Sequence, residues 1–169
     1  MQLKSLEDVF LLHGTDLYRY LLQLSGHSPT AEDLVQDTFL KAYEHLENYQ
    51  GEKVRAWLFR VAFNSYIDWY RREKIHIPTD PGLMENLIRD TQISPEKSCL
   101  TREIRDRWFE EVRRLPELSR QVLLLRDYCD FTYQDIAIIL DLSLTRVKVT
   151  LYRARKKIRE VMENELQGM

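Results

Sequence analysis

Residues 132–159, TYQDIAIILDLSLTRVKVTLYRARKKIR, contain two apolar-periodic stretches joined by a short polar segment. Thr132 and Asp135 form the S/T-x-x-D/E pattern of a helix start, in which a hydroxyl caps free backbone N–H groups and the helix dipole favours an acid. Ser143 stands at the same capping position before the second stretch. The spacing therefore predicts a short helix and a longer one, separated by a tight turn.

The side chains around this turn have the sizes that two crossing helices need. Ala137 is small where the helices would approach each other, and Leu142 lies in the turn. Val147, Leu151 and Ile158 recur at helical spacing and form the apolar stripe of the longer helix. Together these positions predict a helix-turn-helix.

The other side of the longer helix is strongly basic. Residues 143–159 carry seven Lys or Arg and no Asp or Glu. Such a face suits the major groove of DNA, where the front of the helix reaches base edges and the remaining cations neutralise phosphates. An amphipathic surface helix that happens to be basic is the alternative, and the preceding helix and turn disfavour it. The predicted DNA-binding residues on this helix are Arg146, Lys148, Tyr152, Arg153, Lys156 and Lys157.

Charge is unevenly distributed along the 169 residues, although the net charge is only −2. Residues 1–50 carry three Lys or Arg against eight Asp or Glu, whereas residues 51–74 carry six against three. One acidic region and two separate basic regions indicate a protein partner for the first and a polyanion for the others. The charges alone could equally belong to ordinary helix faces that contact only solvent.

Periodicity along the rest of the chain predicts an all-α protein of two small helical domains. The further helices are expected at about 5–24, 28–46, 53–74, 99–114 and 117–128. Ser28 and Pro29 are expected to begin the second of these, as N-cap and first helical residue. Residues 76–98 hold three of the five prolines and lack periodicity, as a linker does. The predicted domains are residues 1–75 and 99–169.

The second predicted helix combines a buried stripe with an acidic edge. The expected buried residues, at spacings of four, three and four, are Val35, Phe39, Ala42 and Leu46. Polar and acidic side chains next to exposed apolar ones suit a protein–protein interface, whereas a merely solvated face carries the same charges. The candidate interface residues are Asp33, Gln36, Asp37, Leu40 and Tyr43.

The third predicted helix is rich in both aromatic and basic residues. Six aromatic residues fall between Trp57 and Tyr70, more than one helix face can bury. Aromatic rings interleaved with arginines are typical of single-stranded DNA binding, because bases stack on rings while cations follow the backbone. Burial of most of these rings, Trp57 above all, is the alternative. The candidate DNA-binding residues here are Arg60, Asn64, Arg71 and Arg72.

The sequence lacks the motifs of metal sites, of common catalytic and cofactor sites, and of membrane spans. Cys99 and Cys129 stand alone, without a CxxC pair or a histidine at ligand spacing, so reduced thiols and no metal site are expected. The glycine-rich phosphate loops and the common hydrolase and metalloprotease motifs are absent, so we expect no catalytic residues and no cofactor. Without a signal-like start or an apolar run of about 20 residues, a cytoplasmic protein with no membrane insertion is expected.

Residues 115–159 resemble region 4 of the extracytoplasmic-function (group IV) sigma factors of bacterial RNA polymerase, the region that recognises the minus 35 promoter element. The chain keeps Val147–Lys148 and Arg153-Ala154-Arg155 of the family pattern. It departs from the pattern at Thr145–Arg146, where glycine and threonine are usual, and at Asp141, where glycine or asparagine is common. Aspartate tolerates left-handed backbone geometry, so the turn is expected to form. The altered helix start leaves the preferred DNA sequence open.

The N-terminal block resembles region 2 of the same family. Residues 33–43 are similar to region 2.2, which docks on the clamp coiled coil of the polymerase, and residues 57–72 to regions 2.3 and 2.4, which melt and read the minus 10 element. Asn64 stands where the family has a polar residue that helps to hold an extruded base. The resemblance implies binding to the polymerase core (its beta and beta-prime subunits) and to promoter DNA. It also implies an anti-sigma factor, with or without a membrane anchor.

Two other functions compete with this interpretation. A helix-turn-helix regulator that does not join polymerase would account for the C-terminal block, but it leaves the aromatic and basic third helix unexplained. A helical enzyme acting on nucleic acid would need clustered carboxylates on a basic surface, and the sequence has no such cluster. We therefore expect a transcription initiation factor and not an enzyme.

Overall fold

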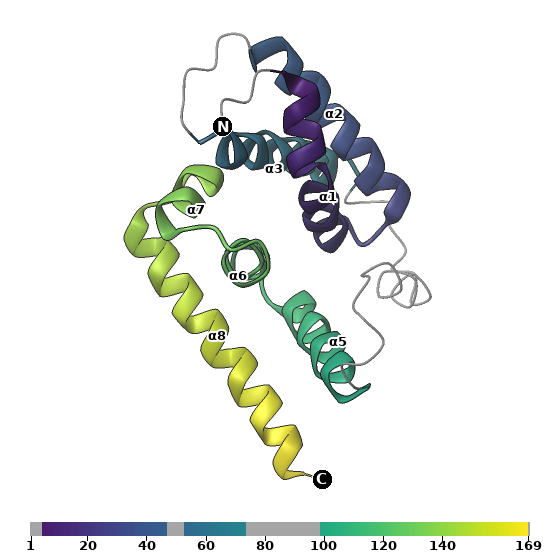
Figure 1. Ribbon diagram of the computed structural model, residues 1–169. Helices are drawn as coiled ribbons and strands as arrows, with labels where there is room; N and C mark the ends of the chain where they lie inside the picture. Colours follow the sequence, from purple (N-terminus) through teal and green to yellow (C-terminus); the bar gives the residue numbers. More distant parts are fainter. Residues whose placement is uncertain (1–4, 47–52, 74–98, 169) are drawn as a thin grey trace.

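The computed structural model describes residues 5–46, 53–73 and 99–168, and every regular element within them is a helix (Figure 1). The elements are α1 (Leu6–Ser25), α2 (Ser28–Leu46), α3 (Val54–Glu73), α5 (Cys99–Arg114), α6 (Glu117–Leu123), η1 (Leu124–Tyr128), α7 (Tyr133–Leu140) and α8 (Leu144–Gln167). The predicted all-α class is confirmed for these residues. The predicted linker, 76–98, lies outside them.

Helices α1, α2 and α3 pack against one another and form the N-terminal domain (Figure 1). Gly26 ends α1 in the left-handed region, at φ 68°, and its N–H donates to the carbonyl of Leu22 at 2.9 Å. A glycine suits this position because it has no Cβ to oppose positive φ. The resulting sharp turn sends α2 back along α1.

The start of α2 differs from the prediction by one residue. The N–H of Ala31 donates to the carbonyl of His27 at 3.0 Å, so His27 occupies the capping position and Ser28 is the first helical residue. The Nδ1 atom of His27 also accepts the N–H of Thr30 at 3.4 Å, which replaces the expected serine cap. A hydrogen bond of 2.8 Å instead links the Ser28 hydroxyl to that of Tyr18 on α1.

The predicted helix-turn-helix is present in α7 and α8. The Thr132 hydroxyl accepts the N–H of Asp135 at 3.1 Å, and the Ser143 hydroxyl accepts the N–H of Arg146 at 3.2 Å, so both predicted caps are confirmed. Asp141 adopts the left-handed conformation, with φ 53° and ψ 53°, as expected for the turn. These three residues set the angle at which α8 leaves α7.

The helix predicted for residues 117–128 changes its winding part-way. After α6 the chain forms the π-helical turn η1, and beyond it Asp130 takes a positive φ of 58°. The Arg126 guanidinium donates to the carbonyl of Phe131 at 2.8 Å and closes this bend. A π-helical turn holds one extra residue, so it redirects the backbone that follows. We call residues 129–131 the 129–131 bend.

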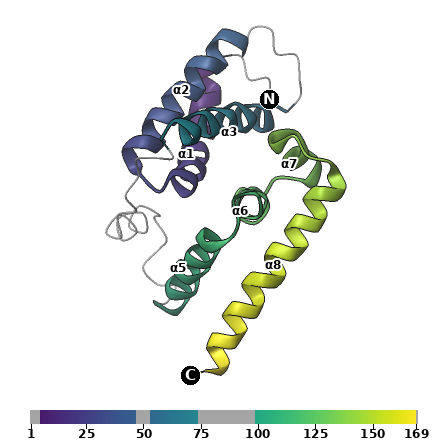
Figure 2. The same ribbon diagram turned by 180° about the vertical axis from the view of Figure 1, so that it is seen from behind.

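The N-terminal and C-terminal helices are in direct contact. In both Figure 1 and Figure 2, α7 lies beside the beginning of α3, and these two helices share many contacts. The Lys53 ammonium lies 2.7 Å from the Asp135 carboxylate across this contact. The longest helix, α8, runs away from the contact towards the C-terminus (Figure 2).

The cap of α8 allows a direct test of the helix-turn-helix. Ser143→Ala removes an acceptor for a free backbone N–H and should cost about 1 kcal/mol of stability. Ser143→Asp keeps an acceptor at the cap and should retain most of the stability that the cap contributes. Urea unfolding followed by circular dichroism measures both variants, and an unchanged midpoint for Ser143→Ala would contradict the assigned cap.

Candidate nucleic-acid and polymerase interfaces

Helix α8 has one apolar side and one exposed basic side. The buried residues are Val147, Leu151, Ala154 and Ile158, three of which form the predicted stripe. All six candidate DNA-binding side chains are exposed: Arg146, Lys148, Tyr152, Arg153, Lys156 and Lys157. By helical periodicity, Lys156 lies at the middle of the exposed side, Tyr152 and Arg153 lie about 50° to either side of the middle, and Lys148 and Lys157 lie at its two edges. The exposed side is thus broad enough for contacts to bases and to both phosphate backbones.

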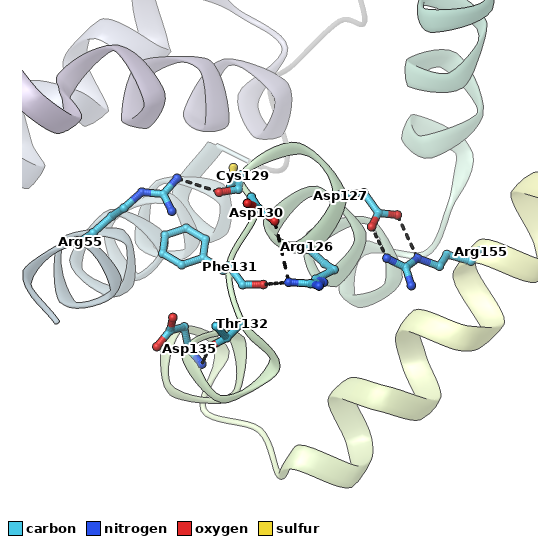
Figure 3. Close-up of polar contacts among 9 residues, drawn as sticks. All are labelled: Arg55, Arg126, Asp127, Cys129, Asp130, Phe131, Thr132, Asp135 and Arg155. Atoms are coloured by element: carbon cyan, nitrogen blue, oxygen red, sulfur yellow. Dashed lines mark hydrogen bonds and ion pairs between the residues drawn. The ribbon is translucent and has the colours of Figure 1, made fainter.

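Arg155 has a different position from its basic neighbours. Its guanidinium donates two hydrogen bonds to the Asp127 carboxylate in η1, as Figure 3 shows. These hydrogen bonds raise the pKa of Arg155. A two-point arginine–carboxylate pair fixes geometry as well as charge. Arg155 therefore ties α8 to η1, and the basic face that DNA would meet carries one cation fewer than the sequence count suggests.

The outer edge of α2 carries four of the five candidate interface residues in exposed positions. Asp33 and Gln36 lie on the same exposed face as Leu40 and Tyr43, whose side chains are 68% and 70% exposed. The opposite side of the helix is buried, as predicted, through Val35, Phe39 and Ala42. Leu46 is helical, but its side chain lies outside the described set. Two large exposed apolar side chains beside acidic and amide groups make a suitable protein-binding edge.

Asp37, the fifth candidate on α2, is half-buried in a polar cluster. Its carboxylate lies 2.7 Å from the ammonium of Lys41, and that ammonium donates to the buried Ser65 hydroxyl of α3 at 2.9 Å. Partial burial acts to raise the pKa of Asp37, but hydrogen bonds from Lys41 and Ser65 outweigh it and lower the pKa. Asp37 therefore takes part in holding α2 against α3. Charge reversal there would disturb the packing as well as any interface.

The exposed side of α3 carries all four residues predicted for it, namely Arg60, Asn64, Arg71 and Arg72. Asn64 and Arg71 line a shallow hollow together with the half-buried Phe63 and Ile67. A second hollow adjoins it, and Asp68 and Arg71 belong to both. Asp68 lies among the arginines and was not singled out from the sequence.

The six aromatic residues of α3 divide between the core and the surface. Phe59 and Tyr66 are fully buried. The other four, Trp57, Phe63, Trp69 and Tyr70, are half-buried. The expectation that a single helix face cannot bury all six is confirmed. The half-buried rings leave part of their surface next to the exposed arginines.

The described ranges contain neither a candidate metal site nor a candidate membrane span. No group of three or more His, Cys, Asp or Glu residues there could hold a metal ion. No helix in the same ranges is long and apolar enough to cross a membrane. Cys129 is a free thiol, as predicted, and burial raises its pKa to about 12.

Comparisons with known proteins agree with this geometry. The Sigma-70 region 2 model matches residues 9–75, and the Sigma-70 region 4 model matches residues 106–158. The chain is 34% identical over 160 residues to RNA polymerase sigma factor YlaC of Bacillus subtilis, covering 94% of this chain and 92% of that protein. It is 30% identical over 155 residues to the ECF RNA polymerase sigma factor SigM of the same organism, covering 92% and 93%. The chain belongs to the extracytoplasmic-function sigma factors.

Solved structures share the fold of this sigma factor. The sigma factor RpoE, in complex with the anti-sigma factor NepR from Bartonella quintana, matches with a TM-score of 0.71 and 24% identity, covering 95% of this chain and 98% of that one. CnrH, in complex with the cytosolic domain of CnrY, matches with a TM-score of 0.70 and 22% identity, covering 96% and 90%. At these identities the likeness concerns the fold alone. In this sigma factor the region 2 match spans α1 to α3, and the region 4 match spans most of α5 to α8.

Proposed function

We propose that this sigma factor binds the polymerase core through the outer edge of α2 and directs initiation at promoters with two recognition elements. In this proposal α8 reads the minus 35 element, and α3 melts and reads the minus 10 element. The observation that carries it is the presence of three exposed faces of different chemistry on one chain. They are acidic and apolar on α2, aromatic and basic on α3, and basic on α8. A regulator that does not join polymerase would need only the basic face of α8.

Reconstitution with purified polymerase core tests this function. The sigma factor should bind core and produce a transcript from a promoter template, whereas core alone should not. A plain DNA-binding regulator would do neither, and an enzyme would alter nucleic acid without polymerase. Failure to bind core would overturn the proposal.

The proposal extends to regulation and location. An anti-sigma factor, soluble or membrane-anchored, would hold the protein inactive in the cytoplasm until a signal arrives, and the protein would act by binding alone, without cofactor or catalysis. Support comes from the family, since RpoE and CnrH are structurally similar and occur in complexes with NepR and CnrY. Co-purification from unstimulated cells should recover such a partner, and recovery of polymerase only would count against it.

Core binding should depend on Asp33 and Leu40. Asp33→Lys places a cation in the acidic edge, and Leu40→Ala removes an exposed apolar anchor, so each should weaken core binding several-fold without changing the melting temperature. Glu103→Lys makes the same charge change at an exposed site on α5 and serves as the control. Titration of fluorescently labelled core measures all three. Equal affinity for wild type and both α2 variants would refute this surface.

Promoter opening should depend on Asn64. Asn64→Ala removes the amide from the α3 hollow, and because alanine favours helix more than asparagine the fold should persist. Open-complex formation on duplex promoters should fall while core binding is unchanged. Asn164→Ala makes the same substitution at an exposed site on α8 and is the control. Normal permanganate reactivity of the Asn64 variant would contradict a role in melting.

Arg153 and Lys157 should contribute differently to recognition of the upstream element. Arg153 lies on the exposed side, about 50° from its middle, so Arg153→Ala should cost about 1 to 3 kcal/mol and relax the preference at one base position. Lys157→Ala should weaken binding to all sequences alike and reduce the salt slope by about one. Binding selections on randomised upstream elements at two salt concentrations measure both effects. Identical preference profiles for wild type and the Arg153 variant would mean that a different helix face reads the bases.

A further inference from the structure

The exposed side of α8 is not uniformly basic. Val149 and Tyr152, which we call the apolar pair, are 41% and 68% exposed. By helical periodicity Val149 lies about 10° from the middle of the exposed side, and Tyr152 is its neighbour on the next turn. In both Figure 1 and Figure 2, α5 and α6 lie on one side of α8, and they pack against it. Because the buried stripe faces these helices, Val149 points away from them.

A valine at this position does not benefit the helix itself. Branching at Cβ restricts the rotamers of valine in a helix, so valine is a weaker helix former than alanine or lysine. The apolar residues Val147, Leu151 and Ile158 are buried and belong to the core. Val149 lies on the other side of the same helix. Its apolar side chain therefore suits a binding partner and not the fold.

Cations surround the apolar pair. Arg146 and Lys148 precede it along α8, Arg153 and Lys156 follow it, and all four side chains are exposed. A protein that covered the pair would also have to desolvate these cations, which costs free energy unless each meets an acid. DNA brings phosphates on both sides of its grooves and neutralises cations as it binds. The position of the pair among cations thus favours DNA as its partner.

The major groove offers one kind of apolar group at the base edges, the C5 methyl group of thymine. Residues three apart on a helix have Cβ atoms about 5–6 Å apart, so one methyl group can contact both side chains of the apolar pair. The contact removes apolar surface from water on both partners and is favourable for that reason. Cytosine has a hydrogen in place of this methyl group. Such a contact therefore selects thymine.

We propose that Val149 and Tyr152 determine specificity by contacting the C5 methyl group of one thymine in the upstream element. The inference rests on the proposed reading of that element by α8. Arg153, four residues after Val149, lies about 6 Å further along the helix, which corresponds to about two base pairs of B-form DNA. The thymine should accordingly lie within about three base pairs of the position that Arg153 reads.

Replacement of thymine by deoxyuridine tests the contact, because it removes the methyl group and keeps every hydrogen-bonding group of the base. The full chain with polymerase core is titrated against promoter duplexes in which each thymine of the selected upstream element is replaced singly. At one position the affinity should fall about fourfold, the effect of burying one methyl group. A selected element without thymine, or no position with lowered affinity, would overturn the proposal. So would a methyl effect far from the position relaxed by Arg153→Ala.

The protein side of the contact is tested by Val149→Ala. This variant should bind the thymine promoter and the deoxyuridine promoter with equal affinity, and its helix content should persist because alanine favours helix. Tyr152→Ala should also reduce the difference, whereas Tyr152→Phe keeps the ring and should retain it. Ile104→Ala removes an exposed apolar side chain from α5 and is the control that should retain it. An undiminished difference for Val149→Ala would refute the contact.

Salt dependence separates methyl recognition from charge. Val149→Ala changes no charge and should leave the salt slope of promoter binding unaltered. Lys156→Ala should reduce the slope by about one and keep the preference for thymine over deoxyuridine. A changed slope for Val149→Ala would mean that the variant disturbs the cations of α8, and loss of the thymine preference in Lys156→Ala would assign that preference to the wrong side chains.

Failure of the proposed function gives a different result. If α8 does not read the upstream element, binding selections on randomised upstream elements recover no preferred sequence. If they recover an element that contains thymine, but wild type binds its deoxyuridine versions equally well, the proposed function stands and the role of Val149 and Tyr152 is refuted.

Discussion

Burial of the apolar stripe on α8 is the contact on which the arrangement of region 4 depends. Val147, Leu151 and Ala154 pack inward, and the small Ala154 lets the helix approach its neighbours closely. Because a helix has only one such stripe, the same burial turns the basic side chains outward. The α2 helix obeys the same constraint, with an acidic and apolar edge left outside. The faces proposed to bind DNA and polymerase core are thus the surfaces that the core leaves exposed.

Much of the fold followed from local sequence patterns. The Thr132 and Ser143 caps and the left-handed Asp141 depend on residues within a few positions of one another, so they can be read without knowledge of the tertiary structure. The stripes of α2 and α8 follow from periodicity for the same reason. The Ser28 cap was predicted wrongly because a histidine ring nitrogen took the accepting role one residue earlier.

The remaining features depend on partners that are distant in the sequence. Nothing near Asp37 indicates that Lys41 joins it to Ser65, because Ser65 belongs to a different helix. The π-helical turn likewise has no repeating pattern, since it inserts one residue into an otherwise regular helix. Arg155 was counted only among the seven cations of residues 143–159, and its pairing with Asp127 joins it to a residue 28 positions away. The exposure of the candidate residues could therefore be predicted from local pattern, whereas the pairing of charges across elements could not.

The two ends of region 4 are tied together at the far end of α8. Arg107 of α5 donates to the Glu165 carboxylate at 2.6 Å, while the Arg155–Asp127 pair holds the middle of α8 to η1. Because α8 is held at two separate points along its length, it resists bending. Force applied to its outer face, such as strain from curved DNA, is then shared with α5 and not concentrated at the turn around Asp141. Helices α5 and α8 and the turn η1 accordingly form one stiff unit.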